Sequence, residues 1–158
     1  MNLYLKQKPI FIRERTKVYD DAGAVRYTAK RAVFSWRKTI RLFDADRAEC
    51  ALIQKKRFSV PPRFSISRGG TEVAEVVLKS RFTDPVYIVK GPGWQSEGGF
   101  RKKDGSVVYE REITDGTRTV MTIRKKRKWR GEAYELSVSP DADEVLVLAV
   151  ALVMDAYW

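Results

Sequence analysis

The residues with the clearest chemical potential in this chain are lysines and arginines that occur in short runs. The chain has 31 of these cations against 20 acidic residues, which gives a formal net charge of +11. Such runs suit anionic partners, although the excess charge could also serve solubility alone. The candidate anion-binding residues are Lys55, Lys56, Arg57, Arg101, Lys102, Lys103, Arg124, Lys126, Arg127, Lys128 and Arg130.

The densest of these runs surrounds Trp129. Cations that flank a tryptophan suit an anionic membrane interface, with the ring at the depth of the head groups. The favoured alternative is a ring that plugs the end of a folded domain, because phenylalanine occupies the equivalent place in related segments of the chain. Arg124 and Lys126 are expected to point outward, and Lys125 inward.

Catalytic chemistry finds little support in the sequence. The chain has no histidine, which excludes histidine-dependent triads and most zinc sites. It also has no nucleophile elbow, Walker loop, dinucleotide fingerprint or EF-hand calcium loop. We therefore expect a protein that is not an enzyme, with no catalytic residues, no metal and no cofactor. A lysine or carboxyl group with a strongly shifted pKa in a cleft would reopen the enzyme alternative.

The basic runs belong to a pattern that recurs along the chain, in which a basic or amide pair precedes an aromatic residue. The aromatic residues are separated by 23, 24, 24 and 47 residues, and the last gap equals two steps: Phe11, Phe34, Phe58, Phe82 and Trp129. A fixed period of this length indicates one supersecondary unit that is used repeatedly.

Each repeat is predicted to contain two β-strands, because apolar residues alternate on both sides of the aromatic residue. The second copy is displaced by one residue, which a β-bulge would explain. Turns rich in aspartate and glycine separate the copies. The predicted inward positions before the aromatic residues are Leu3, Leu5, Gln7, Val25, Tyr27, Ala29, Cys50, Leu52, Gln54, Ala74, Val76, Leu78, Met121, Ile123 and Lys125. Those after them are Ile40, Leu42, Phe64, Ile66, Tyr87, Val89, Tyr134, Leu136 and Val138.

The chain closes on ten consecutive apolar residues, Val145 to Met154. Asp141 and Glu144 are spaced as in a capping box, so a helix is predicted to start near Asp141. A membrane span needs about 20 apolar residues, so this run favours a core helix over a tail anchor. Its burial would contribute roughly 15–30 kcal/mol gross. Asp155 is expected to pair with an arginine at the end of the surrounding sheet.

Together these patterns predict a mainly β fold: an antiparallel closed β-barrel of about twelve strands that encloses one hydrophobic C-terminal helix. Residues 1–158 are expected to form a single domain, with strands over about 2–139 and the helix over about 141–157. The single cysteine excludes an internal disulfide, and no transmembrane span or signal peptide is predicted. A cytoplasmic protein, peripheral at the membrane if it binds lipid, is the expected localisation.

The segments Leu3–Lys8, Gln54–Ser59, Tyr134–Leu136 and Asp143–Ala156 resemble the LURP-one-related family, and the resemblance covers essentially the whole chain. That family is similar to phospholipid scramblases and to the tubby C-terminal domain. The resemblance implies a tubby-like barrel of twelve strands around a hydrophobic helix. Tubby domains bind phosphoinositides through surface basic residues, and scramblases are associated with lipid redistribution and calcium. Lipid scrambling is not expected here, because a calcium loop and a cysteine cluster for palmitoylation are both absent.

The expected function is a non-enzymatic binding module for anionic ligands, namely phospholipid or phosphoinositide head groups at a membrane surface. Two alternatives stay open. Nucleic-acid binding is allowed by the charge but has no RNP, OB-like or helix-turn-helix pattern. The other alternative is a structural or adaptor role, in which the basic surface contacts an acidic protein partner. Whether the basic runs form one patch depends on the strand order, which the sequence does not give, and the oligomeric state is equally open.

Overall fold

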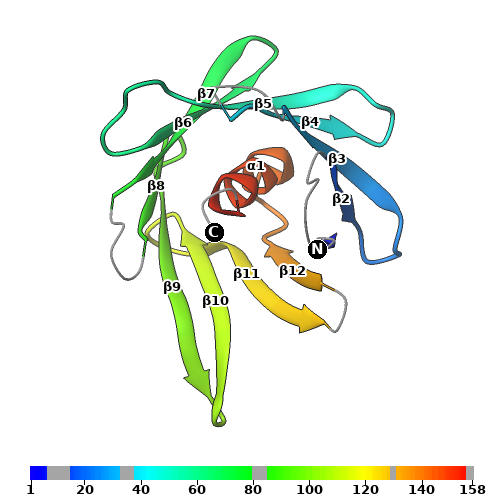
Figure 1. Cartoon of the computed structure of the whole chain (residues 1–158), viewed down its shortest axis with the longest axis vertical. Helices are drawn as coiled ribbons and strands as arrows, with labels where there is room; N and C mark the ends of the chain where they lie inside the picture. Colours follow the sequence, from blue (N-terminus) through cyan, green and yellow to red (C-terminus); the bar gives the residue numbers. More distant parts are fainter. Residues whose placement is uncertain (7–14, 33–37, 80–84, 129–130, 156–158) are drawn as a thin grey trace.

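The computed structural model of the chain describes residues 1–6, 15–32, 38–79, 85–128 and 131–155. They form a closed antiparallel barrel of twelve strands with one helix inside it, which confirms the predicted fold class (Figure 1). The strands are β1 (Asn2–Lys6), β2 (Arg15–Tyr19), β3 (Val25–Arg31), β4 (Ile40–Asp44), β5 (Glu49–Lys55), β6 (Arg63–Arg68), β7 (Thr71–Leu78), β8 (Tyr87–Lys90), β9 (Trp94–Lys103), β10 (Ser106–Thr114), β11 (Thr119–Lys128) and β12 (Gly131–Val138), and the helix is α1 (Glu144–Asp155).

The strand order follows the sequence. Each strand pairs with the next along the chain, and β1 pairs with both β12 and β2, which closes the barrel. Because neighbours are antiparallel, the odd-numbered strands all finish at one mouth of the barrel. We call this mouth the Lys55 end, after the last residue of β5, and the opposite mouth the Asp44 end, after the last residue of β4.

The sequence period corresponds to one β-hairpin. Four hairpins carry one extra residue in their second strand, close to the Asp44 end. These bulged residues are separated by 24, 23 and 47 residues, which repeats the spacing of the aromatic residues: Arg26, Cys50, Val73 and Val120. A bulge increases the local twist of a strand, so its recurrence helps a sheet to curve into a barrel.

The bulges also set which side chains face inward. The first and third residues after each bulge are buried, and the interior alternates from there. This confirms most predicted inward positions, but the prediction for β5 is wrong. Ala51 and Ile53 face the interior, whereas Leu52 and Gln54 lie on the other face, and Cys50 is the half-buried bulge residue. Phe58 lies in the loop after β5, so it does not fix the register of this strand as the repeat spacing predicts. Val25 is likewise exposed, and Gln7 lies outside the described residues.

Helix α1 fills the barrel. Every residue from Leu146 to Asp155 is buried, and Figure 1 shows the helix within the ring of strands. A helix that is apolar on all sides must be covered on all sides, and the closed wall of inward apolar residues provides this cover. The prediction of an enclosed helix is therefore confirmed. In the described part of the chain, no helix has the length and apolar character needed to cross a membrane.

The N-terminus of α1 differs from the prediction by two residues. The carboxylate of Asp143 accepts a hydrogen bond from the Leu146 amide at 3.2 Å, so Asp143 is the N-cap in place of Asp141. Asp141 instead pairs with Arg118 at 2.8 Å. Arg68 pairs with Asp143, and Arg26, the bulged residue of β3, pairs with Glu144. Three arginines of the barrel thus hold the segment that enters it.

The C-terminus of α1 is held at the Lys55 end. Arg31, the last residue of β3, donates from Nη2 to Asp155 Oδ2 at 2.9 Å. This confirms the expected pair between Asp155, the last residue of the helix, and an arginine at the end of the barrel.

Three turns at the Asp44 end are capped in the same way, by an aspartate side chain. The carboxylates of Asp20, Asp44 and Asp115 each accept hydrogen bonds from amides two to four residues further along the chain. Such side-chain caps are typical of aspartate in tight turns. In the last of these turns, the amides of Thr117 and Arg118 hold the pKa of Asp115 well below its usual range. The acidic residues at this end therefore have a structural role.

The corrected register of β5 can be tested with two adjacent residues. Ile53→Ala should lower the free energy of unfolding by about 2–5 kcal/mol, because it leaves a cavity against α1. Leu52→Ala, on the opposite face, should lower it by about 1 kcal/mol or less. Urea unfolding of both variants measures the difference. Equal losses, or a larger loss for Leu52→Ala, would contradict the register.

Candidate anion-binding site

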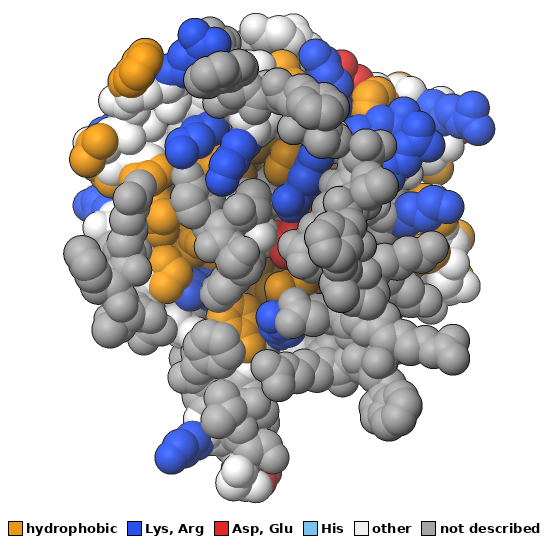
Figure 2. Space-filling model, in the orientation of Figure 1, with side chains coloured by type: hydrophobic (Ala, Val, Ile, Leu, Met, Phe, Trp, Pro, Cys, Tyr) orange, Lys and Arg blue, Asp and Glu red, His pale blue; other side chains and the backbone are white. Residues whose placement is uncertain are grey.

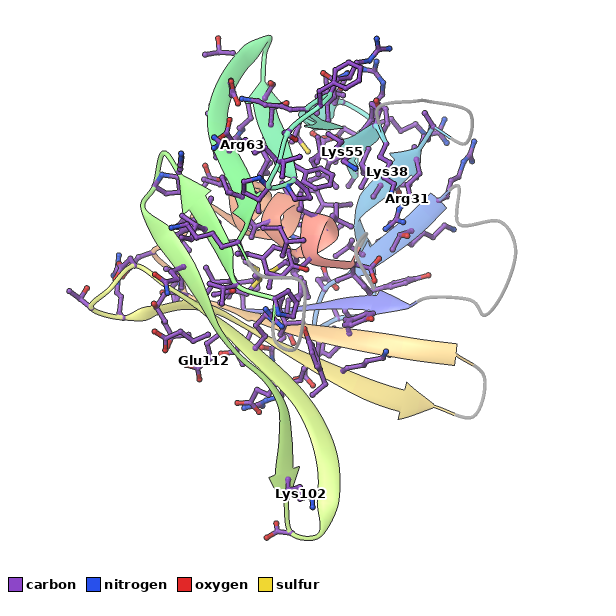
Figure 3. The ribbon with its side chains drawn as sticks, turned by 60° about the vertical axis from the view of Figure 1, so that its left-hand side comes forward. Arg31, Lys38, Lys55, Arg63, Lys102 and Glu112 are labelled. Atoms are coloured by element: carbon purple, nitrogen blue, oxygen red, sulfur yellow. The ribbon has the colours of Figure 1, made fainter. Side chains whose placement is uncertain are left out.

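Two clefts open at the Lys55 end, on neighbouring hairpins. The larger cleft, of about 530 Å³, lies at the β5–β6 loop and is lined by Lys55, Lys56, Arg57 and Phe58. The smaller cleft, of about 190 Å³, is lined by Arg31, Ala32, Lys38, Thr39 and Ile40. Figure 3 shows Arg31, Lys38 and Lys55 gathered on one side of the barrel. Strand order therefore places cations from two repeats beside each other.

The interior of the barrel offers little space for a ligand. Around the end of α1 the described residues enclose a cavity of only about 10 Å³, lined by side chains that include Tyr109, Met154 and Asp155. This is about the space that one water molecule needs. A larger molecule must therefore bind to the outer surface, where Figure 2 shows lysines and arginines over the upper part of the view, in which Figure 1 places β3 to β7.

Lys56 anchors the β5–β6 loop to the barrel wall. Its ammonium group contacts Glu72 at 3.0 Å and also hydrogen-bonds Glu75, which Arg63 contacts at 2.8 Å. The hydrogen bond to Glu75 raises the pKa of Lys56, and the same bond lowers the pKa of Glu75. Lys55, the last residue of β5, lies on the inner side of the barrel and pairs with the buried Phe64 of β6. Arg57 is exposed and forms no ion pair with any residue that the structure describes.

The β5–β6 loop displays two apolar side chains. Phe58 is 100% exposed and Val60 is 93% exposed, and no other large apolar side chain in the described ranges exceeds 45%. The aromatic residue of this repeat therefore lies in solvent and does not plug the barrel, whereas the plug predicted for Trp129 falls outside the described residues. The backbone of Phe58 is left-handed, with φ of 53°, a conformation that non-glycine residues seldom adopt.

The second predicted run, Arg101 to Lys103, does not join the clefts. The run forms the end of β9, and the turn that follows it is Asp104–Gly105. Strands β9 and β10 are long enough to carry their hairpin beyond the barrel, and Figure 3 shows Lys102 at its far tip, away from Lys55. The side chains of Arg101 and Lys103 lie outside the described part of the structure.

The third run lies on β11, whose last residues are at the Lys55 end. Arg124 points outward as predicted, but its Nε contacts Glu110 at 3.1 Å, so its charge already has a partner. Lys125 lies on the inner side as predicted, with Nζ 5.7 Å from the centre of the Tyr134 ring. The structure describes the strand but not the side chains at Lys126, Arg127 and Lys128, and Trp129 and Arg130 lie outside the described residues.

Sequence reasoning missed two groups of cations. Arg31 and Lys38 line the smaller cleft, and the repeat period could have found Arg31, because it lies 24 residues before Lys55, in the same place one repeat earlier. Arg111 is 1% exposed inside the barrel, where its guanidinium lies 5.3 Å from the Tyr87 ring and donates from Nε to Tyr109 Oη at 3.0 Å. It also donates to the Pro85 carbonyl, so it ties β10 to the start of β8.

The described residues contain no group of three or more His, Cys, Asp or Glu side chains that could hold a metal ion. Burial raises the pKa of the Cys50 thiol, and its Sγ donates to the Leu42 carbonyl at 3.3 Å. A raised pKa disfavours the thiolate, so Cys50 is a poor nucleophile.

Comparison with known proteins identifies the family of this chain. The family described as LURP-one-related matches residues 1–155, which includes every described strand and the helix. The chain belongs to the LURP-one-related family. Its similarity to the uncharacterized protein YxjI of Bacillus subtilis (strain 168) is 27% identity over 155 residues, which cover 98% of this chain and 92% of that protein. No solved structure matches the chain.

The ion pairs that anchor the loop of this LURP-one-related protein predict a pH dependence. Because Lys56 lowers the pKa of Glu75 in the folded state, the pair stabilises the fold above the ordinary pKa of 4.5. This stability is lost as the pH falls through the lowered folded-state pKa. We expect Glu75→Gln to lose less free energy of unfolding than the wild type between pH 7 and about pH 3, as measured by urea unfolding. Lys56→Gln should reduce the same dependence, and an unchanged dependence in both variants would contradict the assignment.

Proposed function

We propose that this LURP-one-related protein is a non-enzymatic module that binds anionic phospholipid head groups, phosphoinositides included, at a membrane surface through the Lys55 end of its barrel. The observation that carries the proposal is the cleft of about 530 Å³ lined by Lys55, Lys56 and Arg57 beside the exposed Phe58. Cations next to an exposed aromatic ring are typical of surfaces that meet an anionic membrane.

The distribution of charge supports one orientation at such a surface. Acidic side chains cap the turns at the Asp44 end, whereas the described clefts at the Lys55 end are lined by cations and carry no acidic residue among their described lining. An anionic surface attracts the second end and repels the first, so the molecule would approach with the Lys55 end forward.

The residues of the proposed site are not equivalent. Lys55, Lys56 and Arg57 form its centre, and Arg31 and Lys38 extend it to the neighbouring hairpin. Arg31, Lys56 and Arg124 contribute less than the others, because each already pairs with a carboxylate: Asp155, Glu75 and Glu110 respectively. Lys126, Arg127, Lys128 and Arg130 remain predicted contributors from the Lys55 end of β11 and beyond, and Arg101, Lys102 and Lys103 would act only if the surface also reached the β9–β10 hairpin.

Flotation with vesicles tests the proposal. The triple variant Lys55→Gln/Lys56→Gln/Arg57→Gln should bind vesicles of phosphatidylcholine and phosphatidylserine about a hundredfold more weakly, because each cation near the surface contributes about 1 kcal/mol. The control variant Lys17→Gln/Arg47→Gln/Lys90→Gln removes the same charge from exposed positions away from the Lys55 end. It should bind almost as well as the wild type.

The same assay separates the alternatives. An excess of a single-stranded oligonucleotide should leave the protein on the vesicles. Wild-type protein that stays unbound, or that leaves the vesicles for the oligonucleotide, would contradict the lipid proposal, and the second result would favour nucleic-acid binding. Equal weakening of both triple variants would show that only net charge matters and that the cleft is not the site.

A further inference from the structure

The β5–β6 loop is built to keep its apolar side chains in solvent. Ser59 Oγ donates to the Lys56 carbonyl at 3.0 Å and accepts from the Arg63 amide at 3.1 Å, and the Lys56 amide donates to the Arg63 carbonyl at 2.8 Å. The Pro62 carbonyl accepts from the Leu78 amide at 3.0 Å, which ties the loop to β7. The exposure of Phe58 and Val60 is therefore a property of a hydrogen-bonded loop, because these bonds hold its backbone in place.

The surroundings of these two side chains point to one kind of partner. Cations precede them directly, at positions 55 to 57, and the chain holds Phe58 and Val60 two residues apart on one loop. An anionic bilayer offers both complements at once, with phosphates for the cations and acyl chains below them for the apolar groups. An unstacked base could cover the Phe58 ring, but it gives Val60 no comparable partner.

We propose that Phe58 and Val60 insert into the outer part of an anionic bilayer, while Lys55, Lys56 and Arg57 contact the head groups above them. This inference rests on the proposed function but goes beyond it, because capture by charge alone needs no apolar contact. It makes the β5–β6 loop a membrane-inserting element, and it assigns the loop two kinds of contribution. The electrostatic contribution is screened by salt, and the apolar contribution is not.

The first test measures depth. Phe58→Trp should show tryptophan fluorescence that is quenched by phospholipids with brominated acyl chains, beyond the quenching of the wild-type tryptophans. Val73→Trp is the matched control, because Val73 is partly exposed near the Asp44 end and should gain no quenching. Vesicle binding of Phe58→Trp without added quenching would overturn the insertion and leave the proposed function standing. If the wild type does not bind vesicles at all, the proposed function itself is wrong. Vesicle binding is measured in the same samples, so the two outcomes are distinguishable.

The second test separates the two contributions. At raised salt, Phe58→Ala/Val60→Ala should bind phosphatidylcholine and phosphatidylserine vesicles about tenfold or more weakly than the wild type, since partial burial of two apolar side chains is lost. Val60→Ala alone, which leaves the described lining of the cleft intact, should bind soluble glycerophosphoserine as the wild type does. Equal vesicle binding by the double variant and the wild type would overturn the proposal. So would a Phe58→Trp signal that responds to an oligonucleotide and not to vesicles, which would assign the ring to base stacking.

Discussion

The structure depends on the enclosure of a helix that is apolar on every side. Such a helix has no face to offer water, so it requires a wall that closes around it, and twelve strands with alternating inward side chains provide that wall. Charged pairs fix the helix at both ends of the barrel. Arg26, Arg68 and Arg118 hold the acidic segment that enters it, and Arg31 holds Asp155 at the other end. The helix therefore needs the barrel wall to cover its apolar side chains, and the wall needs the helix to fill the barrel interior.

Enclosure of the helix decides where binding can occur. The filled interior leaves the described residues a cavity of only about 10 Å³, so a ligand larger than water must bind on the outer surface of the barrel. Antiparallel order divides the connections between two ends. Aspartate-capped turns close one end, where their carboxylates bond to backbone amides. The other end carries the basic clefts and the exposed Phe58. One hairpin repeat thus gives the barrel two ends of opposite chemistry.

The sequence predicted the elements with regular alternation and missed details that depend on the loops between them. Leu3, Val76 and Leu136 were placed correctly, because strands of a half-buried sheet must alternate. The predicted register of β5 is wrong because the bulge at Cys50 sets the strand, whereas Phe58 lies in the loop that follows. Asp143 caps the helix in place of the predicted Asp141, which pairs with Arg118. The grouping of Arg31 and Lys38 with Lys55 depends on the pairing of β3 with β4 and of β4 with β5, which the local sequence patterns do not give.

Amide hydrogen exchange with and without anionic vesicles tests the central claim most directly, because it reports on α1 and on the β5–β6 loop in one experiment. If the helix is enclosed and the loop meets the membrane, the amides of α1 exchange only through global unfolding in both conditions. The amides of residues 57–60 are then slowed when vesicles are present. Fast exchange of α1 in solution, or exchange of α1 that changes with vesicles while residues 57–60 do not respond, would contradict the account.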